Sequence, residues 1–72
     1  SVQPVSITVS DNTNQEVRVQ NAEGQQLEVY NLIGVRVSTF RIDSADKTVT
    51  LGVQRGCYIL KIGKVVRKVF LR

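Results

Sequence analysis

Few residues of this chain are of a type that could carry out chemistry. Asp43 and Asp46 lie three positions apart in the segment Asp43-Ser44-Ala45-Asp46, and the chain has no histidine. Two carboxylates can serve acid–base catalysis or hold a metal ion, but both tasks need further groups nearby. No second acidic cluster and no glycine-rich phosphate loop accompany them. We therefore expect a solvated turn here, with no catalytic residues, no cofactor and no metal site, in a protein that is not an enzyme.

Cys57 is the only cysteine, so an internal disulfide and a Cys-rich metal site are excluded. Without histidine, Ser–His–Asp and Cys–His arrangements are excluded as well. A buried Cys57 would act as a small hydrophobic residue. An exposed one would allow an intermolecular disulfide in an oxidising compartment. A homodimer through Cys57, or by exchange of edge strands, therefore stays open.

The net charge of +4 is distributed unevenly along the chain. Residues 61–72 contain no acid and carry Lys61, Lys64, Arg67, Lys68 and Arg72. Such a segment favours a well-solvated edge strand, charged so that it does not pair with foreign strands. An anionic partner is the alternative interpretation.

The elements that must position these residues are strands, because apolar and polar residues alternate along most of the chain. The alternating runs are Val5–Val9, Val17–Val19, Leu27–Val29, Val35–Val37 and Val49–Leu51. The runs Cys57–Ile62 and Val65–Leu71 are more continuously apolar, so we expect them to be central or covered on both faces. No segment has helical spacing. About seven short strands predict an all-β chain, either a sandwich or a small barrel.

Length and composition indicate one globular domain, 1–72, near the lower size limit for a single core. We expect it to be a fragment of a larger protein, because it opens abruptly at Ser1. No apolar run approaches the ~20 residues of a membrane-spanning helix. Residues 1–21 also lack the pattern of a signal peptide.

The segment Asn31–Gly34 reads as a hairpin loop. The Asn31 side chain can bond its own downstream backbone, and Gly34 can take the positive φ that closes such a loop. Leu32 and Ile33 are unusual in a turn. We expect them to fold back over the open end of the sandwich, with a contact surface as the alternative.

The last two runs can pair as a hairpin around Gly63-Lys64. Alternation then places Val69 and Leu71 on the core side, and Lys68, Phe70 and Arg72 on the outward side. An aromatic residue between two cations makes a candidate docking surface. An edge strand can also add to a partner's sheet. Burial of Phe70 under a loop or the second sheet is the alternative.

The order of the motifs carries a resemblance. The segment "VRVQNAEGQQLEVYNLIGVRV" is followed by "TVTL" and then by "GCYILKIGKVVRKVFLR". This order resembles the C-terminal sorting domain (type A) of the type IX secretion system of Bacteroidota. The matching residues are Gly24, Leu27, Val29, Tyr30, Asn31, Gly34, Val37, Gly56, Tyr58, Lys61, Ile62, Lys68, Val69, Leu71 and Arg72. Cys57 departs from the pattern, in which Ile or Val usually follows the glycine.

The resemblance implies an immunoglobulin-like antiparallel β-sandwich that serves as a secretion signal. Such domains follow an N-terminal cargo domain into the periplasm, are recognised by the outer-membrane translocon, and are often removed by a sortase-like peptidase. The implied location is the periplasm in transit, then the outer membrane, the cell surface or the medium. The residues implied in translocon recognition are Lys68, Val69, Phe70, Leu71 and Arg72, and the scaffold positions are Gly34, Gly56 and Tyr58.

Two other functions are alternatives. A small basic nucleic-acid-binding barrel would suit the pI of about 9.7. However, two Tyr and two Phe form no clustered stacking platform, so we expect no nucleic acid as a partner. A structural or adhesive β-sandwich module of a surface protein is the second alternative. Such a module would be retained on the mature protein, whereas a sorting signal would be required for export and then lost.

Overall fold

The computed structural model describes residues 3–72, and this part of the chain folds into seven strands without a helix. No helix in the described range could therefore cross a membrane. All strand pairs are antiparallel. The strands are β1 (Ser6–Asp11), β2 (Glu16–Gln20), β3 (Gln26–Asn31), β4 (Arg36–Arg41), β5 (Asp46–Thr50), β6 (Gly56–Ile62) and β7 (Val65–Leu71).

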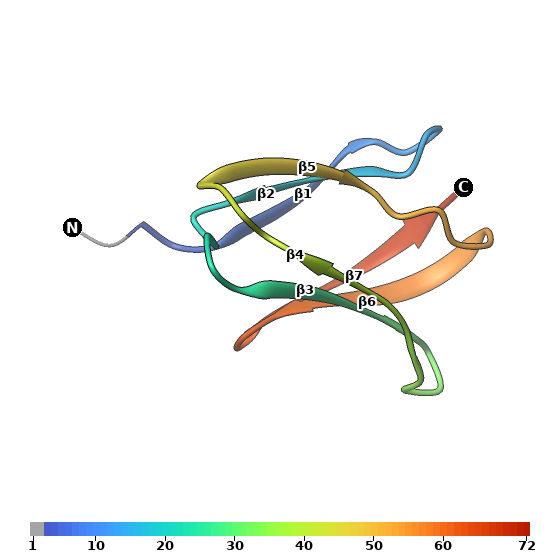
Figure 1. Cartoon of the computed structure of the whole chain (residues 1–72). Coiled ribbons are helices and arrows are strands. Elements are labelled where there is room, and N and C mark those ends of the chain that lie inside the picture. The colour runs from blue at the N-terminus through green and yellow to red at the C-terminus, as the bar shows by residue number, and fades with distance from the viewer. Residues whose placement is uncertain (1–2) are drawn as a thin grey trace.

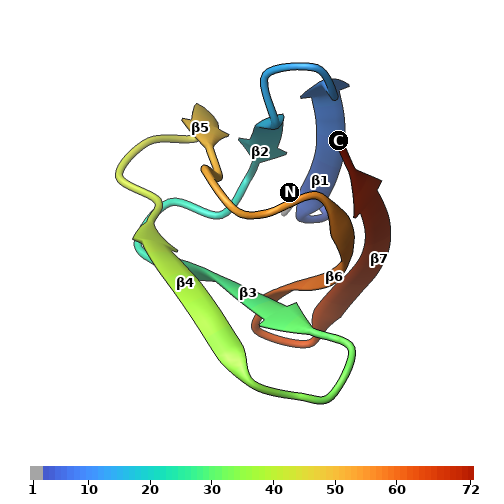
Figure 2. The ribbon, with the colours of Figure 1, turned by 90° about the vertical axis from the view of Figure 1, so that its right-hand side faces the viewer.

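Two sheets pack face to face (Figures 1 and 2). One has the order β1-β2-β5 and the other β4-β3-β6-β7. In the immunoglobulin constant-domain arrangement the fourth strand pairs with the fifth. Here it pairs with the third and joins the opposite sheet. The predicted immunoglobulin-like sandwich of seven short strands is confirmed, with this change at one edge.

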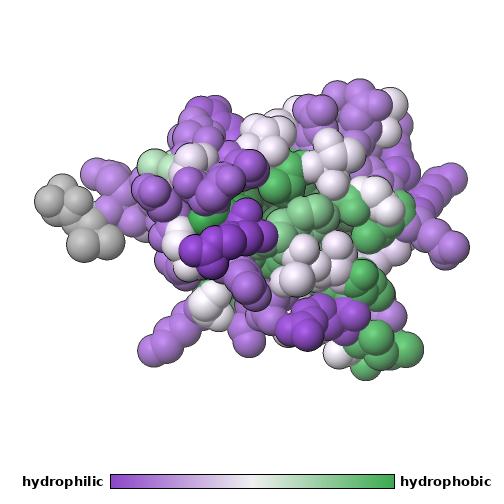
Figure 3. Space-filling view, in the orientation of Figure 1, coloured by the Kyte–Doolittle hydropathy of each residue, from purple (hydrophilic) through white to green (hydrophobic). Residues whose placement is uncertain are grey.

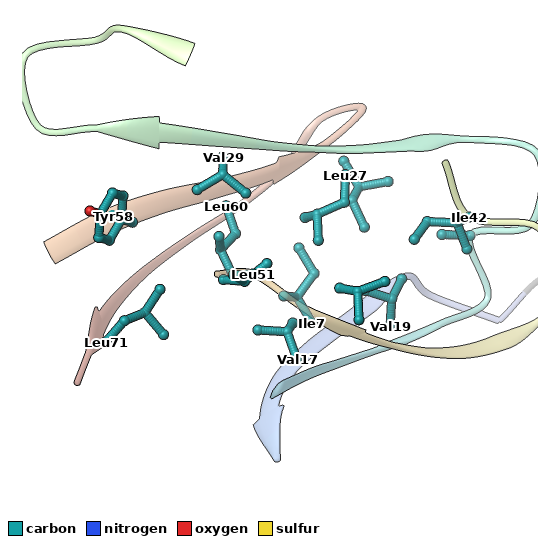
Figure 4. Packing of buried hydrophobic residues seen from close by; sticks show 13 residues of the cluster. Ile7, Val17, Val19, Leu27, Val29, Ile42, Leu51, Tyr58, Leu60 and Leu71 are labelled. Atoms are coloured by element: carbon teal, nitrogen blue, oxygen red, sulfur yellow. The ribbon is translucent and has the colours of Figure 1, made fainter. Parts of the chain in front are cut away.

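The hydrophobic core fills the space between the sheets (Figure 4). It contains Ile7, Val17, Val19, Ala22, Leu27, Val29, Ile42, Val49, Leu51, Tyr58, Leu60, Ile62 and Leu71. Alternation explains most of this set. On β2, for example, Val17 and Val19 are fully buried while Arg18 between them is exposed. On the side of the molecule formed by β4 and β5, hydrophobic residues are visible at the surface between the two sheets (Figure 3).

Tyr58 fixes the connection that leads into β6. Its ring is buried in the core, and its hydroxyl donates a hydrogen bond to the main-chain oxygen of Gln54 at 2.6 Å. Immunoglobulin-like domains have a tyrosine near the start of their sixth strand that bonds the backbone a few residues upstream. Tyr58 occupies this position, as a core residue with its hydroxyl at the rim.

The prediction that Val65–Leu71 is central or covered on both faces is wrong. Within residues 3–72, β7 pairs with β6 alone, so it is an edge strand, whereas β6 lies between β3 and β7 as expected. Its apolar run is continuous because Val66 and Phe70 point outward and remain exposed. An apolar outer face gives the same sequence pattern as burial on both sides.

In a half-buried strand, alternation would place Val35 and Val37 on the core side and Arg36 on the water side; this expectation is wrong, because both valines are exposed. The pairing of β3 with β4 shifts between Val29 and Tyr30, so that β4 holds one extra residue. Such a bulge reverses which residues face inward beyond it. Phe40, opposite Leu27, therefore packs against the core from β4.

The expected cap formed by Leu32 and Ile33 is not present. The two side chains are 56% and 84% exposed. Hydrophobic side chains accordingly gather over the β3–β4 loop, at the lower right of the molecule (Figures 1 and 3). The Asn31 side chain holds the loop in a tight turn by accepting hydrogen bonds from the N–H groups of Ile33 and Val35, and the loop does not fold back over the core.

Candidate functional site

The residues suggested for recognition all lie at the end of β7, and the structure divides them by face. Leu71 is fully buried and Val69 packs against the core. Lys68 and Phe70 are exposed on the other side, and Arg72, the residue after β7, is exposed as well. This is the division that the alternation predicted. Val69 and Leu71 therefore fix the strand, and the other three side chains are available for contact.

Phe70 is 48% exposed, so the alternative of a covered ring does not hold. Cys57 lies opposite it on β6 and is itself half-buried. The guanidinium carbon of Arg55 lies over the Phe70 ring, 5.8 Å from its centre. A cation at this distance is attracted to the electron-rich ring face. Arg55 and Phe70 therefore form a cation–π pair at the surface beside the end of β7.

The outward surface continues from β7 across the four-stranded sheet. The register places Lys68 beside Ile59, Ile59 beside Tyr30, and Tyr30 beside Arg36. Tyr30 and Ile59 are half-buried, and Lys68 and Arg36 are exposed. Tyr30 is thus partly exposed, on the face of β3 opposite to the buried Leu27 and Val29. The row combines apolar area at its centre with a cation at each end.

Charge differs between the two outer faces of the sandwich. By register, the outer face of the four-stranded sheet carries Arg36, Arg41, Lys61 and Lys68, with Glu28 as its acid. Glu28 accepts a hydrogen bond from Arg36 at 3.1 Å. The outer face of the three-stranded sheet holds Glu16 and Arg18, which pairs with Asp46, among Ser, Thr and Gln residues. The cationic and apolar surface of the domain is therefore the outer face of the four-stranded sheet.

Asn12, which the sequence reasoning did not single out, holds the end of β7. Its Nδ2 donates to the main-chain oxygen of Phe70, and its Oδ1 accepts from the main-chain N–H of Arg72, both at 3.0 Å. The side-chain amide thus pairs with the edge of β7 as the backbone of another strand would. Asn14 in the same loop instead donates twice to the Asp11 carboxylate, which lowers the pKa of Asp11.

Gln15 completes the attachment of the β1–β2 loop to the end of the chain. The sequence reasoning did not single it out either. It is the one buried polar side chain in the described range. Its Oε1 accepts from the N–H of Val53 at 2.9 Å. Its Nε2 donates to the main-chain oxygens of Val53 at 2.8 Å and of Arg72 at 2.7 Å. Its φ of +55° is unusual for a residue with a side chain and could not be inferred from a polar run such as Asp11–Gln15.

The three scaffold positions have structural roles. Gly34 closes the β3–β4 loop with φ +89°, a conformation that costs little only for glycine. Gly56 is the first residue of β6, where an added Cβ would lie 3.8 Å from Tyr58 Cε2, an ordinary contact. Tyr58 bonds the preceding loop. None of the three lies on the exposed recognition side of β7.

The carboxylates considered for chemistry have separate partners. Asp43 is bonded by Lys47 at 3.1 Å, and Asp46, the first residue of β5, is bonded by Arg18. Both contacts lower the pKa of the carboxyl group. The described residues contain no group of three potential metal ligands and form no pocket. In comparisons with protein-family models, curated proteins and solved structures, the chain matched none.

Proposed function

We propose that this chain is a C-terminal sorting domain, which directs an attached cargo protein across the outer membrane by the type IX secretion system. The order of its sequence motifs and the immunoglobulin-like sandwich support this proposal. Its partners are then the translocon, a sortase-like peptidase that removes the domain, and the cargo. The domain passes through the periplasm and reaches the cell surface.

The observation that carries the proposal is the division of β7 into two faces. Leu71 and Val69 anchor the strand on the core, while Lys68 and Phe70 are exposed on an edge strand and Arg72 is exposed just after it. A translocon that recognises the folded domain needs exposed side chains that the fold holds in fixed positions. Apolar contact at Phe70 and cations around it suit an interface with an apolar centre and a charged rim.

The test is surface delivery of a reporter in a Bacteroidota host. The fusion carries a signal peptide, the reporter and residues 1–72. Deletion of Lys68–Arg72 is unsuitable, because it removes the fully buried Leu71 and would damage the fold. The informative variant is Lys68→Ser/Phe70→Thr, which changes only exposed side chains. Its matched control is Lys61→Ser/Val66→Thr, a cross-strand pair on the same outer face but nearer the β6–β7 turn.

We expect the unchanged fusion and the control to reach the surface and lose the domain. Lys68→Ser/Phe70→Thr should accumulate in the periplasm, folded. Failure of the unchanged fusion to leave the periplasm would contradict the proposed function. Delivery with the domain retained on the mature protein would instead favour a structural or adhesive module.

A further inference from the structure

The hairpin that joins β3 to β4 exposes an unusual amount of aliphatic surface. Of the six large hydrophobic side chains that are exposed in residues 3–72, four lie within this one segment: Leu32, Ile33, Val35 and Val37. We call these four residues the apolar tip. Single exposed hydrophobic residues are common on proteins, but a contiguous group marks a site of contact. Neither the core nor the proposed recognition by β7 uses them.

Hydrogen bonds made by Asn31 and Gly34 fix the turn that carries the apolar tip. Asn31 Oδ1 accepts hydrogen bonds from the N–H groups of Ile33 at 3.2 Å and of Val35 at 2.9 Å. The backbone adds bonds from Gly34 to the Asn31 oxygen and from Asn31 to the Val35 oxygen. These bonds restrict the backbone that carries Leu32 and Ile33, which reduces the entropy lost when the two side chains become buried in a partner.

The apolar tip projects away from the rest of the domain. The β1–β2 loop lies at the same end of the sandwich but points away from the tip (Figures 1 and 2). Asp11 ends β1 and Glu16 begins β2, so these two acidic residues flank the β1–β2 loop and lie away from the apolar tip. β1 begins at the opposite end of the sandwich from the tip (Figure 1).

Cations accompany the apolar tip. Arg36, the first residue of β4, lies between Val35 and Val37 in the chain and is exposed, although Glu28 neutralises part of its charge. Arg55 lies at the same end of the sheet, because the register pairs Asn31 with Tyr58 just after the β5–β6 loop. Lys68 lies in the same cross-strand row as Arg36. A projecting aliphatic group with cations behind it is complementary to a surface that has an apolar interior and an anionic boundary.

We propose that the apolar tip inserts into an anionic lipid surface, with Leu32 and Ile33 below the headgroups and Arg36, Arg55 and Lys68 at the level of the phosphates. A convex tip needs a matching pocket in a protein partner, whereas a fluid bilayer accepts it in any shape. Burial of two aliphatic side chains and attraction of the cations act together here, as in other proteins that bind at membrane interfaces. The proposal is independent of the secretion function.

The test is cosedimentation of the purified domain with vesicles of phosphatidylcholine, pure or with about a third phosphatidylglycerol. Leu32→Ser/Ile33→Ser removes the two most exposed side chains of the apolar tip. Val66→Ser is its matched control, at an exposed aliphatic residue outside the tip. Arg55→Gln tests the cations. Lys64→Gln is its control, in the turn at the other end of β7, roughly 20 Å away and beyond the screening length.

We expect binding to the anionic vesicles that weakens with salt. Leu32→Ser/Ile33→Ser should lower the partition coefficient at least about ten-fold, and Arg55→Gln about five-fold, with both controls close to the unchanged domain. Absence of binding by the unchanged domain, or equal binding by Leu32→Ser/Ile33→Ser, would overturn the proposal. A dimer in sedimentation velocity that this variant abolishes, without vesicle binding, would overturn it too and assign the tip to a second copy of the chain.

Discussion

The side chain of Asn12 bonds the backbone of Phe70, 58 positions further along the chain, with 3.0 Å between Nδ2 and the Phe70 oxygen. Together with the bond from Arg72 N–H to Asn12 Oδ1, it occupies the edge of β7 where another strand would otherwise pair. Open strand edges invite such pairing. Asn12 therefore leaves little free backbone at this end of β7. A partner can contact the exposed side chains of Lys68 and Phe70 instead.

Replacing Asn12 with alanine should release this end of the strand. Because two hydrogen bonds of about 0.5–1.5 kcal/mol each are lost, we expect Asn12→Ala to lower the free energy of unfolding by about 1–3 kcal/mol. Hydrogen exchange of the Arg72 amide should become faster. Urea denaturation and amide exchange measure the two effects. Asn14→Ala, in the same loop but bonded only to Asp11, should leave the exchange of Arg72 unchanged. Unaltered exchange in Asn12→Ala would contradict the assigned role.

Gln15 should be more sensitive than Asn12, because its amide is buried. Gln15→Leu leaves the N–H and oxygen of Val53 and the oxygen of Arg72 without this partner. Unsatisfied buried groups are costly, so we expect a loss of about 2–4 kcal/mol in the free energy of unfolding. Gln15→Glu should also destabilise, since a carboxylate cannot donate to the two oxygens. Gln26→Ala, at an exposed position of β3, is the control for urea denaturation. Equal stability of Gln15→Leu and the control would refute this prediction.

The hydroxyl of Tyr58 should contribute to stability while that of Tyr30 should not. Tyr58→Phe removes the bond to the Gln54 oxygen and leaves that oxygen near the buried ring. We expect a loss of about 1 kcal/mol, which thermal unfolding would register as a drop of roughly 4–8 °C in Tm. Tyr30→Phe, on the half-exposed outer face, should unfold at the unchanged temperature. Identical Tm values for the two variants would contradict a stabilising role of the bond from the Tyr58 hydroxyl to the Gln54 oxygen.

Acid should destabilise the domain in a defined range. The pKa values of Asp11, Asp43 and Asp46 are lowered from 3.8 by hydrogen bonds from Asn14, Lys47 and Arg18 respectively. The folded state therefore binds fewer protons than the unfolded state near that pH. The stability that these contacts contribute is present in full above pH 3.8 and is lost as pH falls through the lowered values.

Urea denaturation at a series of pH values from about 5 to 2 would follow this loss. Asp43→Asn/Asp46→Asn should show a shallower decline, because two of the three groups no longer titrate. The same decline in the variant and the unchanged domain would show that other carboxyl groups determine acid sensitivity.

Much of the fold could be predicted from the sequence, because alternation is a local property. The inward positions Val17, Val19, Leu27 and Val29 follow from parity along single strands. Ala22 and Ile42 are also buried, yet they lie in connections where no alternation marks them. Ile42 is placed by backbone bonds to Gly24 and Gln25, 18 and 17 positions earlier in the chain, which continue the pairing of β3 with β4. Such long-range pairing leaves no periodic signal.

The candidate site divides in the same way. The sequence by itself determined the two faces of β7, since successive side chains of a strand must point to opposite sides. Only the tertiary structure decided that β7 is an edge strand, that β4 has a bulge at Val37, and that the hydrophobic residues of the β3–β4 loop remain exposed. It also brought Asn12 and Gln15 to the end of β7. These features depend on which elements become neighbours, and that is set by the packing of the whole chain.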